Sequence, residues 1–262
     1  MWIGVGKGKG GAGCTTSALE LAYAATRRRT RSGGLRNVAV LDLDPQGNAT
    51  DVLEPASRRI GIKDVLAPEE PLALSDVLVP TVWDQILVAP ADRFLANREA
   101  DLTSSGIATL RRARLGGEIA DLVDDVIIDL PRDIGKITAA GLLGIEHLFI
   151  TARSTIWGAQ GAEEMRYTAQ RISGKGNPEL KISGYIVAAH EETEDSRRVL
   201  SEMKSRFGDL LLAPSIPRNP QVSEALESYH TPCREYGPGL KTIADIYQDF
   251  YDRLLETADD SQ

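Results

Sequence analysis

A glycine-rich segment near the N-terminus is the strongest chemical signal in this sequence. Residues 4–22 read GVGKGKGGAGCTTSALELA, an apolar stretch that leads through closely spaced glycines into two threonines and an amphipathic pattern. Glycines allow backbone N–H groups to turn toward a phosphate, and the positive end of a following helix dipole favours negative charge there. The segment therefore predicts a phosphate-binding loop between a strand and a helix.

A dinucleotide-binding loop is one interpretation of these glycines. Gly6, Gly8 and Gly11 fit the pattern G-x-G-x-x-G, and Asp42 and Asp44 end the next predicted strand, where such a fold places an acid. A chain with so many glycines meets this pattern easily by chance. It also leaves the paired threonines without a role.

A mononucleotide P-loop is the second interpretation, and a turn without any ligand is the third. The P-loop pattern G-x-x-x-x-G-K-[ST] is met by Gly8, Gly13 and Thr15. The position of its lysine, however, is occupied by Cys14. The residues alone leave these interpretations open.

The elements that must position this loop alternate along the chain. Apolar runs of about five residues are typical of buried parallel strands, and amphipathic stretches between them predict helices. This alternation predicts an α/β fold with a parallel sheet covered by helices on both faces. The predicted strands are 2–5, 38–43, 85–88, 126–130, 147–151 and 182–187, with short late candidates at 210–212 and 215–216. The predicted helices are 15–29, 92–112, 137–144, 159–172, 196–207 and 240–257.

Length and composition favour a single globular domain. The 262 residues carry a net charge of −8 and are 42% hydrophobic, which excludes a disordered, fibrous or disulfide-scaffold protein. We expect one domain over residues 1–258 and a frayed tail at 259–262. Only two cysteines occur, Cys14 and Cys233, and no apolar run approaches the length of a membrane span, so we expect a cytoplasmic protein that does not bind membranes.

Several motifs resemble those of the ParA/MinD family of partitioning ATPases, which have a deviant Walker A loop. KGGAGCTT, residues 9–16, resembles the family's KGGxGKTT, and VAVLDLDPQGNAT, residues 38–50, resembles its second motif. DVIIDLP, residues 125–131, is similar to its Walker B strand. ILVAPADRFLANREADL and IPRNPQVSEA, residues 86–102 and 216–225, resemble further family segments. The resemblance implies a P-loop NTPase-like, three-layer α/β fold with a mostly parallel, twisted sheet.

The resemblance also implies roles for individual residues toward ATP, ADP and Mg²⁺. Lys9 stands at the signature lysine that reaches the nucleotide of a dimer partner, and Asp44 at the residue that positions the attacking water. Thr15, Asp42 and Asp129 are the expected Mg²⁺ residues. The expected phosphate-binding residues are Gly10, Gly11, Ala12, Gly13, Cys14, Thr15 and Thr16. Pro217, Arg218 and Asn219 are expected beside the base and ribose.

The function implied is a nucleotide-dependent dimerising switch for plasmid or chromosome partitioning. It would form a homodimer with ATP bound and respond to a ParB-like centromere-binding protein. Non-specific DNA binding, and with it nucleoid association, is possible in this family through surface cations. The candidates here are Arg197, Arg198, Lys204, Arg206 and Lys241. The acidic net charge, and Gln221 at a position often held by arginine, argue against it.

Cys14 raises the question of how active such a switch can be. A cysteine carries no positive charge and donates only weakly, so losing the lysine's charge-assisted hydrogen bond should weaken ATP binding by roughly 10- to 150-fold. We expect Cys14→Lys to raise turnover at least tenfold, unless Lys9 or Lys7 supplies the charge. A solvated position is the simpler expectation for Lys7. Cys14 should favour its thiolate at a helix N-terminus beside lysines. The alternative function is a nucleotide-binding dimerisation module that does not hydrolyse ATP.

Overall fold

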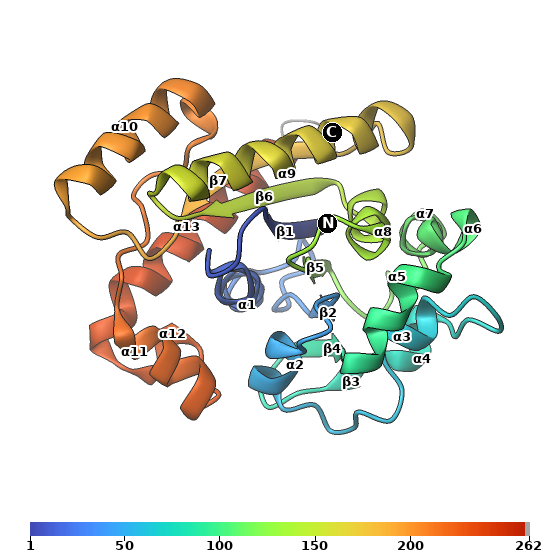
Figure 1. The fold of residues 1–262 in the computed structure, drawn as a ribbon. Helices are drawn as coiled ribbons and strands as arrows, with labels where there is room; N and C mark the ends of the chain where they lie inside the picture. Colours follow the sequence, from blue (N-terminus) through green and yellow to red (C-terminus); the bar gives the residue numbers. More distant parts are fainter. Residues whose placement is uncertain (260–262) are drawn as a thin grey trace.

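A seven-stranded sheet forms the centre of the protein, whose computed structural model describes residues 1–259 (Figure 1). Six strands run parallel, and only β3 is antiparallel to its neighbour, which confirms the predicted α/β fold. In spatial order the strands are β3 (Val79–Pro80), β4 (Ile86–Ala89), β2 (Val38–Asp42), β5 (Asp125–Asp129), β1 (Trp2–Lys7), β6 (His147–Ala152) and β7 (Lys181–Val187). Most of the tail predicted to fray, residues 260–262, lies outside the described residues.

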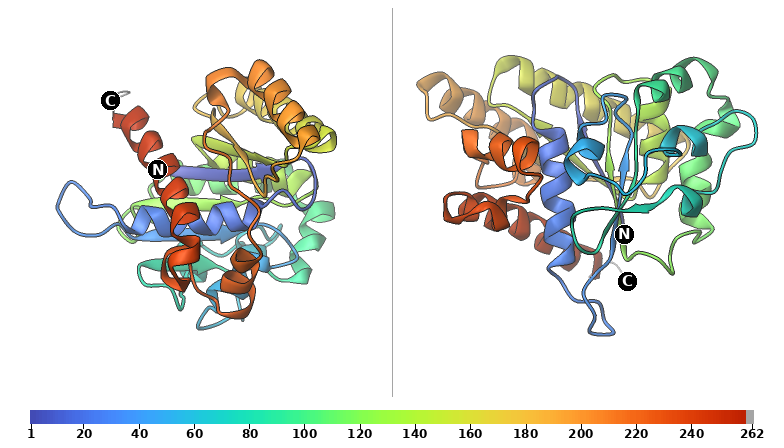
Figure 2. Two further views of the ribbon diagram at one scale, coloured as in Figure 1. Left: turned by 90° about the vertical axis from the view of Figure 1, so that its left-hand side faces the viewer. Right: turned by 90° about the horizontal axis from the view of Figure 1, so that it is seen from below.

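Helices cover both faces of this sheet, so the molecule has three layers (Figure 2). One face is covered by α1 (Cys14–Thr26), α2 (Asn48–Leu53), α12 (Cys233–Tyr236) and α13 (Lys241–Asp259). The other is covered by α7 (Thr109–Leu115), α8 (Lys136–Gly144), α9 (Ile156–Lys175) and α10 (Glu194–Phe207). Shorter helices are α3 (Ile62–Val65), α4 (Leu74–Val77), α5 (Arg98–Asp101), α6 (Ser104–Ile107) and α11 (Pro220–Ser223). Single turns of other helix types occupy Arg93–Asn97, Gly208–Leu210, Glu224–Ser228 and Pro238–Leu240.

The position of β1 in the sheet decides where the glycine-rich loop lies. β1 pairs with β5 on one side and β6 on the other, and all six of its residues are buried. Val5 is level with Asp129 of β5, and Asp129 is level with Asp42 of β2. Because the carboxyl ends of parallel strands share one edge, the loop after β1 emerges beside both acids.

Two sequence predictions of secondary structure are wrong in detail. The stretch 92–112 is not one helix, because the backbone at Leu102 is extended (ψ 120°) and its side chain is buried. A new helix then begins after Thr103, whose side chain accepts a hydrogen bond from Gly106 N. The late strand candidates 210–212 and 215–216 run beside β7 but make only isolated contacts, from Leu212 N to Tyr185 O and from Ile216 N to Val187 O.

The last helix belongs to the core. The apolar face of α13 is buried against α1, which lies across it (Figure 2). It consists of Ile243, Ile246, Tyr247, Phe250 and Leu254. The helix predicted over 240–257 is thus present and packs into the core. Within residues 1–259, every helix is too short or too polar to cross a membrane.

Candidate functional site

Close packing against α9 holds the start of the glycine-rich loop in place. A Cβ atom added at Gly8 would lie 1.9 Å from the carbonyl oxygen of Gly161, well inside van der Waals contact. The loop therefore depends on the absence of a side chain at this position. At the other end, Gly13 adopts a left-handed conformation (φ +71°) and begins α1. A left-handed residue is favourable only for glycine.

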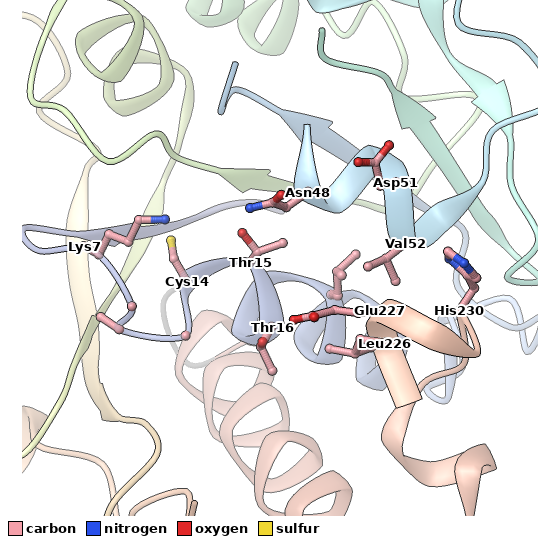
Figure 3. A pocket seen from close by; sticks show the side chains of 14 residues that line it. Lys7, Cys14, Thr15, Thr16, Asn48, Asp51, Val52, Leu226, Glu227 and His230 are labelled. Carbon is pink, nitrogen blue, oxygen red and sulfur yellow. The ribbon is translucent and has the colours of Figure 1, made fainter. Parts of the chain in front are cut away.

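The N-terminus of α1 is open toward a cavity. No side chain caps this helix end, so the N–H groups of its first turn, at Cys14, Thr15 and Thr16, remain available as donors. They lie beside a cavity of 520 Å³, the loop cavity, which Figure 3 shows from close by. Such an arrangement of free N–H groups and a helix dipole suits a phosphate.

Three carboxylates lie at or just after the ends of β2 and β5, at the edge of the sheet from which the loop emerges, although none of them lines this cavity. Asp42 and Asp129 are fully buried, and Asp44 is 6% exposed. Burial raises the pKa of both Asp42 and Asp129, and their proximity raises the pKa of Asp42 further. A buried cluster of like charges is unfavourable by itself, so this edge of the sheet favours cations.

The three carboxylates differ in how many hydrogen bonds they already accept. Asp42 Oδ2 accepts from the backbone and hydroxyl of Thr50 at 2.8 and 2.7 Å, and Asp42 Oδ1 from Asp44 N at 3.1 Å. Asp44 Oδ1 accepts from Gln46 N at 3.0 Å. Both oxygens of Asp129 are buried and have no hydrogen-bond partner within residues 1–259.

These residues fit Mg²⁺. A hard cation prefers carboxylate and hydroxyl oxygens, and Asp129 at the end of β5 and Thr15 at the start of α1 offer both at the same edge of the sheet. Asp42 already accepts hydrogen bonds from Thr50 and from Asp44 N, so it is a weaker candidate for a metal ligand than Asp129. The metal assignment to Thr15, Asp42 and Asp129 remains a prediction, with Asp129 as its centre.

Cys14 and Lys7 do not have the environments that their sequence positions suggest. The Cys14 side chain is 2% exposed and its Sγ donates to Val5 O at 3.1 Å, so it points into the core. Burial raises the pKa of Cys14 well above its ordinary value, and the charge of Asp129 raises it further. The expected thiolate is therefore wrong, because desolvation outweighs the helix dipole and the lysines.

Lys7 is buried rather than solvated. It is the last residue of β1 and is 8% exposed, and its Nζ lies 3.8 Å from Asp44 Oδ2. Burial by itself lowers the pKa of Lys7, but nearby carboxylates, Asp129 and Asp44 among them, raise it. The net shift is upward, so Lys7 stays charged.

Lys9 and the other cations lie outside the loop cavity. Lys9 is exposed beside Gly161 of α9 and does not line the loop cavity, and within residues 1–259 it makes no ion pair. The basic residues of α10 are largely neutralised, because Arg198 pairs with Asp195 and Glu202, Lys204 lies 3.5 Å from Asp209, and Arg206 lies 3.8 Å from Glu163. These pairs weaken the case for a DNA-binding surface on this helix.

A second cavity of 460 Å³, the base cavity, lies on the other side of the loop. Pro217, Arg218 and Asn219 all line it, together with Gly11, Gly13 and Thr16. Arg218 pairs with Glu191, and the Asn219 side chain caps α11 by accepting from Gln221 N at 3.0 Å. The structure thus brings the predicted base-binding residues to the loop, while giving Asn219 a structural role as well.

Several residues that line the loop cavity were not predicted from the sequence. Asn48 and Asp51 of α2 face the loop, and Glu227 and His230 approach from the C-terminal part of the chain (Figure 3). Asn48 belongs to the quoted 38–50 motif and could have been singled out there. Glu227 and His230 carry no local signal, because only the fold of residues 220–236 brings them to the loop.

Known proteins similar to this chain match it along most of its length. The family model described as an AAA domain matches residues 1–182. The chromosome partitioning protein ParA of Caulobacter vibrioides is 29% identical over 231 residues, covering 85% of this chain and 82% of the relative. The sporulation initiation inhibitor protein Soj of Bacillus subtilis is 28% identical over 254 residues, covering 94% and 95%. A crystal structure of cobyrinic acid a,c-diamide synthase from Mycobacterium smegmatis with ADP and magnesium is 28% identical, with a TM-score of 0.78 over 100% of this chain and 96% of that one.

Proposed function

Because the chain belongs to the ParA/MinD-type family of ATPases, we propose that it is a nucleotide-dependent switch for plasmid or chromosome partitioning that binds and hydrolyses ATP. One observation carries the proposal. The open N-terminus of α1 lies beside Asp129, whose two buried oxygens lack partners. Donors for phosphate and acceptors for a cation thus meet at one edge of the sheet, as nucleotide hydrolysis requires.

The N–H groups of Gly10 to Thr16 would bind the phosphates of the nucleotide. Thr15 and Asp129 would hold Mg²⁺, which when bound would partly neutralise the negative charge that develops on the phosphates. Asp44 would orient the attacking water. The hydrogen bond from Gln46 N to its Oδ1 fixes the carboxylate, and its Oδ2, which lies 3.8 Å from Lys7 Nζ, would accept from that water. The base and ribose would occupy the base cavity, against Pro217.

Dimerisation would be the output of the switch. Lys9 is exposed and without an ion pair among residues 1–259, so it is free to reach a nucleotide bound by a second copy. ATP would then join two protomers face to face. A ParB-like centromere-binding protein would stimulate hydrolysis and so separate them.

A non-hydrolysing dimerisation module is the second candidate function. The buried, neutral thiol of Cys14 favours it, because this side chain can neither approach a phosphate nor carry charge. The two candidates differ in turnover and not in binding. A nucleotide switch that never hydrolyses would dimerise with ATP and stay dimeric.

A phosphate-release assay tests the proposal. The purified protein is incubated with ATP and Mg²⁺, alone, with duplex DNA, and with a ParB-like centromere-binding protein. Turnover that rises with the partner supports the switch, and ATP binding without any phosphate release supports the second candidate. The absence of nucleotide binding under all conditions would refute both.

Retention on duplex DNA tests nucleoid association separately. Protein with ATP should bind DNA of any sequence at about 50 mM salt and release it near physiological salt, because phosphate contacts weaken steeply as salt rises. Because three of the four cations of α10, Arg198, Lys204 and Arg206, already lie close to carboxylates, we expect this retention to be weak. A failure to bind at about 50 mM salt would eliminate a DNA-tethered role.

A further inference from the structure

We propose that Lys7, at the end of β1, supplies the positive charge for the nucleotide phosphates that Cys14 cannot supply. The inference rests on the proposed function and names the residue on which its binding step depends. It assigns this chain a relocated lysine, which reaches the phosphates from the strand before the loop and not from the helix after it.

The first support is the direction of the two side chains. Cys14 Sγ donates to Val5 O, so the thiol faces the core. The Lys7 side chain lines the loop cavity together with residues 11–16, and Figure 3 shows its amino end beside Cys14 on the side toward Thr15. The small Cys14 side chain leaves room for the ammonium group of Lys7.

The second support is the scarcity of positive charge around the phosphate position. Among the described residues that line the loop cavity, Lys7 is the single lysine or arginine. Lys9 and Arg132, whose side chain lies near Gly10, are exposed and do not line this cavity. The arginines of the base cavity, Arg153 and Arg218, both lie close to Glu191. A triphosphate beside three carboxylates needs a cation other than Mg²⁺, and Lys7 is in place.

The third support is that Lys7 is buried at this acidic edge of the sheet without a close ion pair. A lysine is almost never buried without a close partner. The nearest carboxylate oxygen, Asp44 Oδ2, lies 3.8 Å from Nζ, at the outer limit of an ion pair. The ammonium group of Lys7 can therefore bind a further anion, such as a phosphate. The raised pKa of Lys7 keeps this group protonated.

We expect substitutions of Lys7 and Cys14 to have coupled effects on the affinity for Mg-ADP. A lysine introduced at position 14 would place a second ammonium group beside Lys7, and like charges at close range oppose each other. Cys14→Lys alone should therefore bind Mg-ADP no more tightly than the wild type. This expectation opposes the one drawn from the loop motif alone.

Equilibrium titration of a fluorescent ADP analogue with Mg²⁺ tests the inference independently of turnover. Lys7→Met keeps most of the side-chain volume without charge and should weaken binding by about 10- to 150-fold, the range for a lost charge-assisted hydrogen bond. The double variant with Lys7→Met and Cys14→Lys should regain most of the affinity, since one charge then returns to the cavity. Non-additivity of this kind is the signature of two positions that serve one contact.

Lys63→Met is the matched control. Lys63 is also mostly buried and ion-paired, with Nζ 2.6 Å from Asp92 Oδ2, but it lies outside both cavities. Its substitution should leave affinity unchanged. Circular dichroism without nucleotide shows whether each variant is folded. If Lys7→Met does not fold, the affinity of the Cys14→Lys variant for Mg-ADP still tests the inference, because this variant retains Lys7.

The outcomes separate this inference from the proposed function. Nucleotide binding that is equal in the wild type and Lys7→Met overturns the inference and leaves the function standing. Binding that becomes tenfold tighter in Cys14→Lys alone also overturns it, and restores the view of a weakened loop. If neither the wild type nor Cys14→Lys binds the analogue, the inference and the function both fail.

Discussion

Substitution of Gly8 is the sharpest test of how the loop is held. In Gly8→Ala the new Cβ would lie 1.9 Å from Gly161 O, 2.4 Å from Gly161 C and 2.5 Å from Gly161 Cα. All three are backbone atoms of α9, so no side-chain rotation relieves the clash. To restore ordinary contact, the loop and the helix must separate by about 1.5 Å.

The cost can be bounded from this displacement. Overpacking of a tight contact costs about 1–3 kcal/mol, and for a chain of this size each kcal/mol lowers the midpoint of thermal unfolding by about 2–4 °C. Because the loop itself moves, affinity for Mg-ADP should fall as well. Stabilisation by saturating nucleotide should therefore be smaller in the variant than in the wild type.

Gly174→Ala is the control for this experiment. Gly174 lies on α9 too, but an added Cβ there meets no atom within 4 Å. Alanine should be neutral or up to about 1 kcal/mol stabilising at such a position. Urea unfolding with and without Mg-ADP measures both effects. A Gly8→Ala variant with the unfolding free energy and affinity of the wild type would refute the close packing of loop and helix.

Three further predictions concern Lys9, Asp44 and Glu20. Lys9→Ala should abolish an ATP-dependent shift from monomer to dimer in light scattering, and a dimer that still forms would contradict a role of Lys9 across the interface. Because the Lys9 side chain is exposed, its removal should change the free energy of unfolding by no more than about 0.5 kcal/mol. Asp44→Asn keeps an acceptor for Gln46 N, so nucleotide affinity should stay within a few-fold while turnover falls, and a collapse of affinity with unchanged turnover would show that its role is binding. Burial raises the pKa of Glu20 to about 7, against a hydrogen bond from Cys233 N, so the folded protein holds this proton up to a higher pH than the unfolded chain. The stability it contributes is therefore complete below pH 4.5 and is lost by about 3 kcal/mol as the pH rises to about 7. Glu20→Gln should match the wild type in urea unfolding near pH 4.5 and exceed it at pH 8, and equal stabilities at pH 8 would contradict the raised pKa.

The six main strands and the loop could be predicted from the sequence because their causes are local. A parallel strand buried on both faces is apolar over most of its length, so β1, β2, β5 and β6 each contain a continuous apolar run. Glycines followed by Thr15 and Thr16 have few other uses than a phosphate loop. The acids Asp42 and Asp129 end their strands, and parallel pairing then makes them neighbours.

The rest was decided by contacts between distant parts of the chain. The helix pattern over 92–112 does not reveal the break at Leu102, because that break depends on a core that other elements build. Likewise, Glu227 and His230 reach the loop cavity only through the path of the chain after β7.

The difference is greatest at Cys14 and Lys7. By sequence, the cysteine at a helix N-terminus beside lysines predicts a reactive thiolate, and the lysine at a strand end predicts a solvated charge. The structure turns the thiol toward Val5 O in the core and buries the ammonium group among carboxylates. A residue's charge depends on desolvation and on neighbours that are supplied by other strands, and neither is encoded in the spacing of a motif. The motif thus predicted where a phosphate would bind, and only the tertiary structure showed which lysine lines that cavity.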